Sequence, residues 1–147
     1  MEHPIICIDF DGTIVAHEFP EIGKPFPYAI ECLLHMKRRG WKLILYTCRE
    51  DRKPDEDGEY PHQAYLTQAV EFLKGHGVEF DSINDPLNHV DYRSEHFDKR
   101  KPYADIYLDD KSFPAFPGWP TFAIVHLGAF WDYTHPRNPV LVFPSLS

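Results

Sequence analysis

The chain has 147 residues, of which 43% are hydrophobic and 26% are charged, as is typical of one soluble globular domain. Its formal net charge of −8 disfavours a general binder of nucleic acid or of anionic membranes, because phosphate groups attract basic surfaces. No apolar run approaches the roughly 20 residues that span a bilayer, and the N-terminal "MEHP" does not resemble a signal peptide. We therefore expect a cytoplasmic protein with a single domain over residues 1–147.

Short apolar runs predict the strands of this domain. In chain order they cover residues 5–9, 42–47, 79–83, 104–109 and 121–126. All except 79–83 are largely continuous in apolar residues, which is the pattern of strands covered on both faces.

Two helical patterns separate the first three runs. The stretch "PYAIECLLHMKRRG" begins with Pro27, which suits a first helical turn, and stops at Gly40. The stretch "PHQAYLTQAVEFLKGHG" repeats this order from Pro61 to Gly75. The alternation predicts an α/β fold, a Rossmann-like three-layer sandwich with a central parallel sheet of about five strands and right-handed crossovers.

Two segments show no clear period. Residues 84–100 form a connection long enough to indicate a functional or mobile segment. Residues 128–147 are rich in proline and aromatic residues, so we expect an irregular C-terminal extension. That extension either packs on the domain or meets a partner subunit in a homo-oligomer, and the sequence leaves both alternatives open.

The three cysteines, Cys7, Cys32 and Cys48, are odd in number and far apart, so they predict neither a disulfide framework nor a zinc site. We expect buried free thiols. Cys32 and Arg38 have the C-x5-R spacing of thiol-dependent phosphatases, but the residues between them lack the glycines of a phosphate-binding loop.

Polar residues stand where the predicted strands end. Asp9 ends the first strand, Thr47 the second, and Asp109 with Asp110 the fourth. In open parallel sheets, ligands bind outside these carboxyl ends. Clustered carboxylates repel one another unless a cation lies among them, and hard oxygen ligands favour Mg²⁺, which prefers to share its shell with substrate phosphate. The pattern therefore predicts phosphoryl transfer, with one aspartate as nucleophile and a second as general acid and base.

The motifs "DFDGT", "YTCRE" and "KPYADIYLDDK" resemble those of the haloacid dehalogenase superfamily, specifically its magnesium-dependent phosphatases that form an aspartyl-phosphate. The resemblance covers roughly residues 5–126. It implies that Asp9 is the nucleophile and a metal ligand, and that Asp11 is the general acid and base and offers its backbone carbonyl to Mg²⁺. Asp109 and Asp110 complete the metal site, and either of them is the direct ligand. The implied phosphate-binding residues are Gly12, Thr47, Cys48, Arg49 and Lys101.

The position of the lysine departs from many members of the superfamily. Lys101 lies only eight positions before Asp109, without an intervening helix, and Lys99 and Arg100 compete for its role. This short spacing resembles members associated with capsule or sugar-phosphate metabolism, which favours a small sugar phosphate as substrate. A nucleotide, or the 3′-phosphate of a polynucleotide, is the alternative.

The gaps that hold cap domains in this superfamily are short here, so we expect a capless enzyme. The segment 15–25, called the flap below, offers His17, Glu18 and Lys24 to a substrate, although solvated loop residues are the simpler interpretation. Arg49 and Arg52 bind either the phosphate or neighbouring acidic residues such as Glu50.

Two rivals belong to other functional classes. An EF-hand calcium loop beginning at Cys7 would start with a soft thiol and lacks a preceding helix. A receiver-type phospho-aspartate module uses similar residues, but in another order and without a counterpart of Asp11. A catalytically silent regulatory relative stays open as an alternative function.

Overall fold

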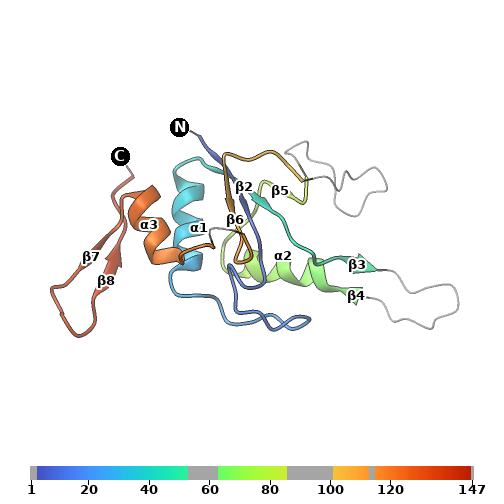
Figure 1. The fold of residues 1–147 in the computed structure, drawn as a ribbon, viewed down its shortest axis with the longest axis horizontal. Helices are drawn as coiled ribbons and strands as arrows, with labels where there is room; N and C mark the ends of the chain where they lie inside the picture. Colours follow the sequence, from blue (N-terminus) through green and yellow to red (C-terminus); the bar gives the residue numbers. More distant parts are fainter. Residues whose placement is uncertain (1–2, 53–62, 86–100, 113–114, 147) are drawn as a thin grey trace, which may run out of the picture.

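The centre of the fold is a four-stranded parallel sheet (Figure 1). The computed structural model describes residues 3–52, 63–85, 101–112 and 115–146. The sheet has the order β5-β2-β1-β6, and its strands are β1 (Ile5–Ile8), β2 (Lys42–Leu45), β5 (Ser82–Ile83) and β6 (Ile106–Leu108). The α/β class is confirmed, with four strands in the sheet where the sequence predicted about five.

Two helices connect the strands as the sequence predicted. Helix α1 (Ala29–Arg38) lies between β1 and β2, and helix α2 (Tyr65–Gly75) lies between β2 and β5. The N-terminus of α2 has no capping side chain of its own. Asp51 supplies one from outside the helix, because its Oδ1 accepts the backbone N–H groups of Leu66 and Thr67 at 3.1 and 3.0 Å.

The fifth predicted strand, 121–126, is wrong. These residues belong to helix α3 (Trp119–Leu127), which has Pro120 in its first turn and is followed by Gly128 in the left-handed region with φ 71°. A short run that is apolar all round suits a buried helix as well as a buried strand, so periodicity alone does not separate the two. The helix packs against the end of α1, where the rings of Phe122 and Trp41 lie 6.4 Å apart.

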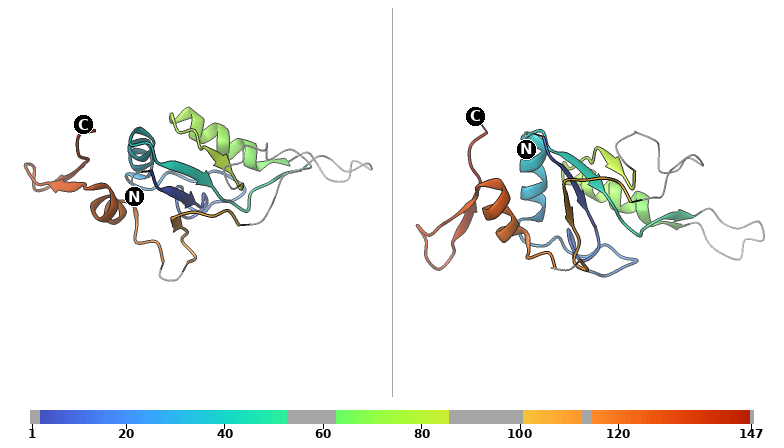
Figure 2. Two further views of the ribbon diagram at one scale, coloured as in Figure 1. Left: turned by 90° about the horizontal axis from the view of Figure 1, so that it is seen from above. Right: turned by 45° about the horizontal axis from the view of Figure 1, so that its top comes forward.

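The main core lies on one face of the sheet. Alternate strand residues, such as Ile6 and Ile8, pack there with residues of all three helices. Figure 2 shows α1 and α2 on the same side of the strands. The other face has a small cluster of Cys7, Ile44 and Ala104 that contains no residue of a described helix. In the described part of the chain, the fold therefore has two layers where the sequence predicted three.

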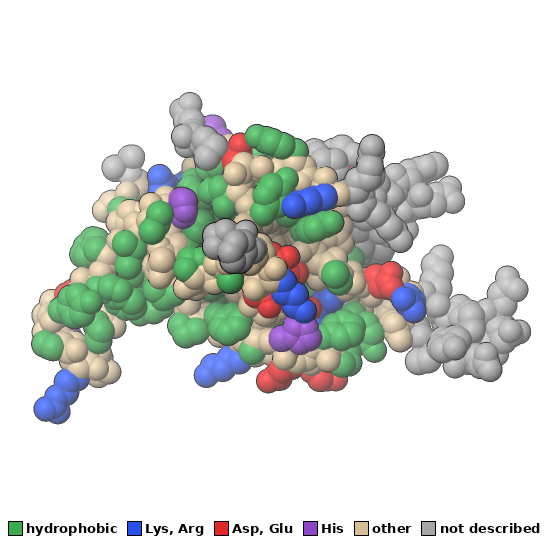
Figure 3. Space-filling view, in the orientation of Figure 1, with side chains coloured by type: hydrophobic (Ala, Val, Ile, Leu, Met, Phe, Trp, Pro, Cys, Tyr) green, Lys and Arg blue, Asp and Glu red, His purple; other side chains and the backbone are tan. Residues whose placement is uncertain are grey.

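The C-terminal segment is more regular than expected. It forms an antiparallel hairpin of β7 (Phe130–Asp132) and β8 (Val140–Val142), which projects from the domain (Figure 1). Leu141 packs into the main core, whereas Phe130 and Val140 are exposed, and Figure 3 shows hydrophobic side chains gathered on this region. A second short hairpin, β3 (Asp51–Arg52) with β4 (Gln63–Ala64), precedes α2.

None of the helices in the described residues has the length and apolarity to cross a membrane.

Candidate active site

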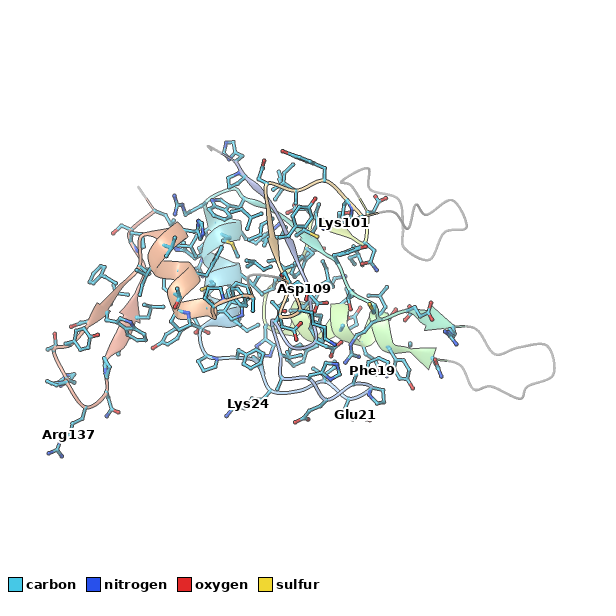
Figure 4. The ribbon with its side chains drawn as sticks, in the orientation of Figure 1. Phe19, Glu21, Lys24, Lys101, Asp109 and Arg137 are labelled. Carbon is cyan, nitrogen blue, oxygen red and sulfur yellow. The ribbon has the colours of Figure 1, made fainter. Side chains whose placement is uncertain are left out.

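The sheet changes its strand order at β1. Strand β2 pairs with one edge of β1 and β6 with the other, so the carboxyl ends of β1 and β6 lie side by side at the topological switch point. Asp9 follows β1, and its backbone N–H donates to the carbonyl of Leu108 at 3.0 Å. Asp109 and Asp110 follow β6 directly, and Figure 4 shows Asp109 near the centre of the molecule. The fold therefore brings the two acidic motifs together.

Asp9, Asp109 and Asp110 form an acidic cluster. Each contributes one carboxylate oxygen to a group whose members all lie within 4.8 Å of one another, and each side chain is partly buried. Burial and then the charge of Asp109 raise the pKa of Asp9 to about 7, with smaller contributions from the other aspartates. Burial also raises the pKa of Asp110, and its hydrogen bond with Asp109 adds to that effect. Asp110 Oδ1 is buried without a hydrogen-bond partner, so the cluster has the free oxygen and the excess negative charge that favour a cation.

Two residues of the DFDGT turn hold this cluster in place. Gly12 has φ 84°, and a Cβ atom there would lie 2.4 Å from Asp110 Oδ2, so only glycine lets the acidic loop approach the turn. The fully buried Thr13 accepts the N–H of Asp110 at its hydroxyl and the indole N–H of Trp119 at its carbonyl, at 3.0 and 2.7 Å. Gly12 thus shapes the acidic loop, and the sequence analysis had not identified Thr13 and Trp119 as part of the site.

Lys101 lines the same cavity as Asp9 and Asp109 of the acidic cluster. This cavity has a volume of about 160 Å³ and is lined by Cys7, Asp9, Tyr46, Lys101, Tyr107, Leu108, Asp109 and Ser112. The ammonium group of Lys101 lies 4.2 Å from the centre of the Tyr107 ring. The Tyr107 hydroxyl in turn donates to the carbonyl of Pro102 and accepts the N–H of Ala104, which fixes the segment that carries the lysine. The competing Lys99 and Arg100 lie outside the described residues.

Thr47 is positioned by a residue that the sequence analysis did not single out. Its backbone N–H donates to Asn84 Oδ1 at 2.8 Å, and its hydroxyl accepts the N–H of Arg49 at 3.1 Å. Asn84 follows β5 and adopts a positive φ of 54°, which asparagine tolerates better than most residues. The carboxyl end of β5 therefore shapes the loop after β2.

Arg49 contacts Asp11, a pairing that the sequence analysis did not predict. Its Nε and Nη2 donate to the two carboxylate oxygens of Asp11, both at 2.8 Å. The remaining donors bind the backbone carbonyls of Pro20, Glu21 and Tyr65 at 3.2, 2.9 and 3.3 Å. All five N–H groups of a guanidinium are then used, and the side chain is fully buried. Arg49 therefore has no free N–H donor for a phosphate in this structure, and its role as a phosphate ligand stays a prediction.

The other candidates lie at the surface. Cys48 is exposed, unlike the buried Cys7 and Cys32, so the expectation of three buried thiols is wrong at that position. Arg52 forms an exposed ion pair with Glu50, which is one of the two alternatives that the sequence left open. His17, Glu18 and Lys24 of the flap are exposed, and Figure 4 shows Lys24 pointing away from the domain. Cys7 lies within β1, so the rival EF-hand loop, which the sequence already disfavoured, does not form there.

The chain was compared with known proteins on sequence and on structure. No family model matches the sequence, and no curated protein matches it. A solved structure of a conserved protein from Bacteroides thetaiotaomicron is similar, with a TM-score of 0.65 and 29% sequence identity. The match covers 84% of this chain and 90% of that chain. This neighbour supports the α/β fold over most of the chain's length.

Proposed function

We propose that this protein is a magnesium-dependent phosphatase that hydrolyses a phosphomonoester through an aspartyl-phosphate on Asp9. The observation that carries the proposal is the cluster of Asp9, Asp109 and Asp110 at the switch point, with Lys101 lining a cavity that Asp9 and Asp109 also line. The resemblance of the motifs to haloacid dehalogenase phosphatases points to the same chemistry. A small sugar phosphate is the substrate class that we favour, and a nucleotide or a polynucleotide 3′-phosphate is the alternative.

The residues of the cluster fit Mg²⁺. Three carboxylates with oxygens within 4.8 Å form a hard oxygen donor set, and Asp110 Oδ1 has no other partner. When bound, Mg²⁺ supplies positive charge that offsets the carboxylates and the substrate phosphate. Asp9, Asp109 and Asp110 would hold the ion, together with the backbone carbonyl of Asp11.

The proposed chemistry gives each of these side chains a role. A carboxylate oxygen of Asp9 bonds to phosphorus while the bond from phosphorus to the ester oxygen breaks, and Asp11 gives a proton to the departing alcohol. In the second step Asp11 takes a proton from water, whose oxygen bonds to phosphorus and releases inorganic phosphate and free Asp9. Lys101 and the Thr47 hydroxyl stabilise the charge of the transferring group.

The test is hydrolysis of 4-nitrophenyl phosphate by the purified chain, with Mg²⁺ and with EDTA. We expect turnover that requires Mg²⁺ and is absent in Asp9→Asn. Asp132→Asn, a change of the same kind in the exposed part of the C-terminal hairpin, is the matched control and should keep full activity. Turnover that survives EDTA, or that persists in Asp9→Asn, would contradict the proposal. A panel of sugar phosphates, nucleotides and 3′-phosphorylated oligonucleotides would then identify the substrate class.

A phospho-aspartate regulatory module is the second candidate. The pairing of Asp11 with Arg49 favours it, because both carboxylate oxygens already accept hydrogen bonds. The lifetime of phospho-Asp9 separates the two functions. A regulatory module would keep its phosphate in wild-type protein, whereas a phosphatase would lose it within one turnover and retain it only in Asp11→Asn.

A further inference from the structure

Arg49 links three parts of the candidate active site that are distant in sequence. Its guanidinium binds Asp11 in the DFDGT turn, the carbonyls of Pro20 and Glu21 in the flap, and the carbonyl of Tyr65 at the start of α2. A guanidinium is rigid and planar, so acceptors that share one of them have fixed relative positions. The position of the flap and the orientation of Asp11 therefore depend on the same group.

Aromatic rings enclose this guanidinium. Its central carbon lies 5.2 Å from the ring centre of Phe10 and 5.1 Å from that of Phe19. Phe19 also packs edge-on against Tyr65, with ring centres 5.3 Å apart, so the tip of the flap rests on Arg49 and on α2. Exclusion of water strengthens the hydrogen bonds to the charged group, because the local dielectric is low.

The base of the flap is also fixed. Ala16 donates its N–H to the carbonyl of Lys24 at 2.9 Å, and a Cβ atom on Gly23 would lie only 2.0 Å from the carbonyl oxygen of Ala16. With its base closed in this way, the flap can lift from the site only if the contacts at its tip with Arg49 and Tyr65 break. Figure 4 shows Phe19, Glu21 and Lys24 together on the side of Asp109 opposite Lys101.

The Asp11 carboxylate keeps the capacity to transfer a proton while Arg49 holds it. A carboxylate has about four lone-pair positions, and the two hydrogen bonds from Arg49 use one on each oxygen. The Asp11 side chain is 13% exposed, whereas the Arg49 side chain is 0% exposed. The pair thus leaves part of the Asp11 side chain accessible to solvent and anchors its carboxylate to a group inside the protein.

We propose that Arg49 is a positioning residue that couples the docked flap to the orientation of Asp11, so that Asp11 is placed for proton transfer only while the flap rests on Arg49. This inference rests on the proposed function. It adds to that function a flap that controls the orientation of Asp11, in place of a cap domain. Arg49 itself does not touch the substrate in this arrangement.

The first test uses leaving groups of different acidity. Arg49→Lys keeps the positive charge but loses the paired hydrogen bonds to Asp11, and Arg52→Lys is the matched control on an exposed arginine in the same segment. Phenyl phosphate needs a proton on its departing oxygen more than 4-nitrophenyl phosphate does. We expect Arg49→Lys to lower kcat/KM for phenyl phosphate by about tenfold more than for 4-nitrophenyl phosphate, and Arg52→Lys to leave the ratio unchanged. An equal loss on both esters would indicate a merely structural role and would overturn the proposal.

The second test asks whether Arg49 acts through Asp11. In the Asp11→Asn background, Arg49→Lys should cause no further change in the ratio between the two esters, because the group that it positions is already gone. Additive effects would contradict the proposal. If Arg49→Lys does not fold, Phe19→Ala carries the same test, since it removes one enclosing ring and leaves both hydrogen bonds between Arg49 and Asp11. It should shift the same ratio in the same direction, and an unchanged ratio would count against the coupling.

Hydrogen exchange of the flap separates this inference from the proposed function. Asp11→Asn should speed amide exchange at Ala16, whose N–H closes the base of the flap, and Arg52→Lys should not. Unchanged exchange in Asp11→Asn would overturn the coupling even if the protein is a phosphatase. Faster exchange without any magnesium-dependent hydrolysis in wild-type protein would instead overturn the proposed function and, with it, the role of Arg49 in positioning Asp11 for proton transfer.

Discussion

Asp9 and Asp11 lie two residues apart in one turn, yet the protein surrounds them in opposite ways. Asp9 lies among other carboxylates, and no described basic side chain lies within ion-pair distance of it. Asp11 has both oxygens bound by a buried arginine whose every donor is used. Repulsion around Asp9 favours a cation from solution, whereas the charge of Asp11 is balanced within the fold. The difference separates a cluster of like charges from an ion pair that balances its own charge.

Substitution of Asp9 or Asp11 tests this difference, and the largest expected effect is on the rate of turnover. Asp9→Asn removes the proposed nucleophile, so hydrolysis should fall to background. Asp11→Asn removes only the proposed general acid and base, and such a group typically contributes about 10²- to 10⁴-fold. Rapid-quench detection of phosphorylated protein checks the distinction, because Asp11→Asn should accumulate phospho-Asp9 and Asp9→Asn should not. Equal rates in the two variants would show that the two aspartates do not divide the work in this way.

The next effect is on the free energy of unfolding and concerns the ion pair between Arg49 and Asp11. Arg49→Met leaves Asp11 as a carboxylate without its partner, and loss of one member of a buried ion pair typically costs about 3–5 kcal/mol. Arg52→Met breaks only an exposed pair with Glu50 and should cost less than about 1 kcal/mol. Urea unfolding of both variants measures the free energies. Similar losses in the two would mean that the burial of Arg49 contributes nothing to stability.

The sequence predicted the acidic cluster around Asp9 better than the pairing of Asp11 with Arg49. Continuous apolar runs indicate buried parallel strands, and the carboxyl ends of such strands share one edge, so Asp9, Asp109 and Asp110 were placed together correctly. The partners of Arg49 lie in the DFDGT turn, the flap and α2, and no local pattern encodes contacts over such separations. For the same reason the hydrogen bonds from the Thr47 N–H to Asn84 and from the Asp110 N–H to Thr13 were not predicted.

The errors in the fold have a local cause. The run 121–126 is apolar on every side, and only its flanking Pro120 and Gly128 distinguish the helix from a strand. In the C-terminal segment, partly buried Trp131 and buried Leu141 pair across the hairpin, but the prolines and aromatic residues around them obscured the short strands. Sequence patterns therefore described the parallel sheet well and the segments that pack on its margin poorly.

Binding of Mg²⁺ tests the difference between Asp9 and Asp11 without a measurement of turnover. A ligand that binds only the folded protein stabilises it by about 2.7 kcal/mol at a hundred times its Kd. Addition of Mg²⁺ should therefore raise Tm in wild type, and the rise should vanish in Asp9→Asn. It should persist in Asp11→Asn, which keeps its backbone carbonyl. Differential scanning calorimetry measures the shift, and loss of the shift in Asp11→Asn would place that side chain in the metal site.

The last effect is the pH dependence of the protein's thermal stability in EDTA. Burial and the neighbouring carboxylates raise the pKa of Asp9 from 3.8 to about 7, so the folded state binds a proton at Asp9 more tightly than the unfolded state does. The resulting stability is fully present below about pH 4 and is lost as the pH rises through 7. Asp9→Asn has no such proton to lose, so its Tm relative to wild type should increase between pH 5 and pH 8. Mg²⁺ should reverse the order at pH 8, because only the wild-type cluster gains a cation. If the difference in Tm is constant across this range, the repulsion around Asp9 is not the feature that distinguishes it from Asp11.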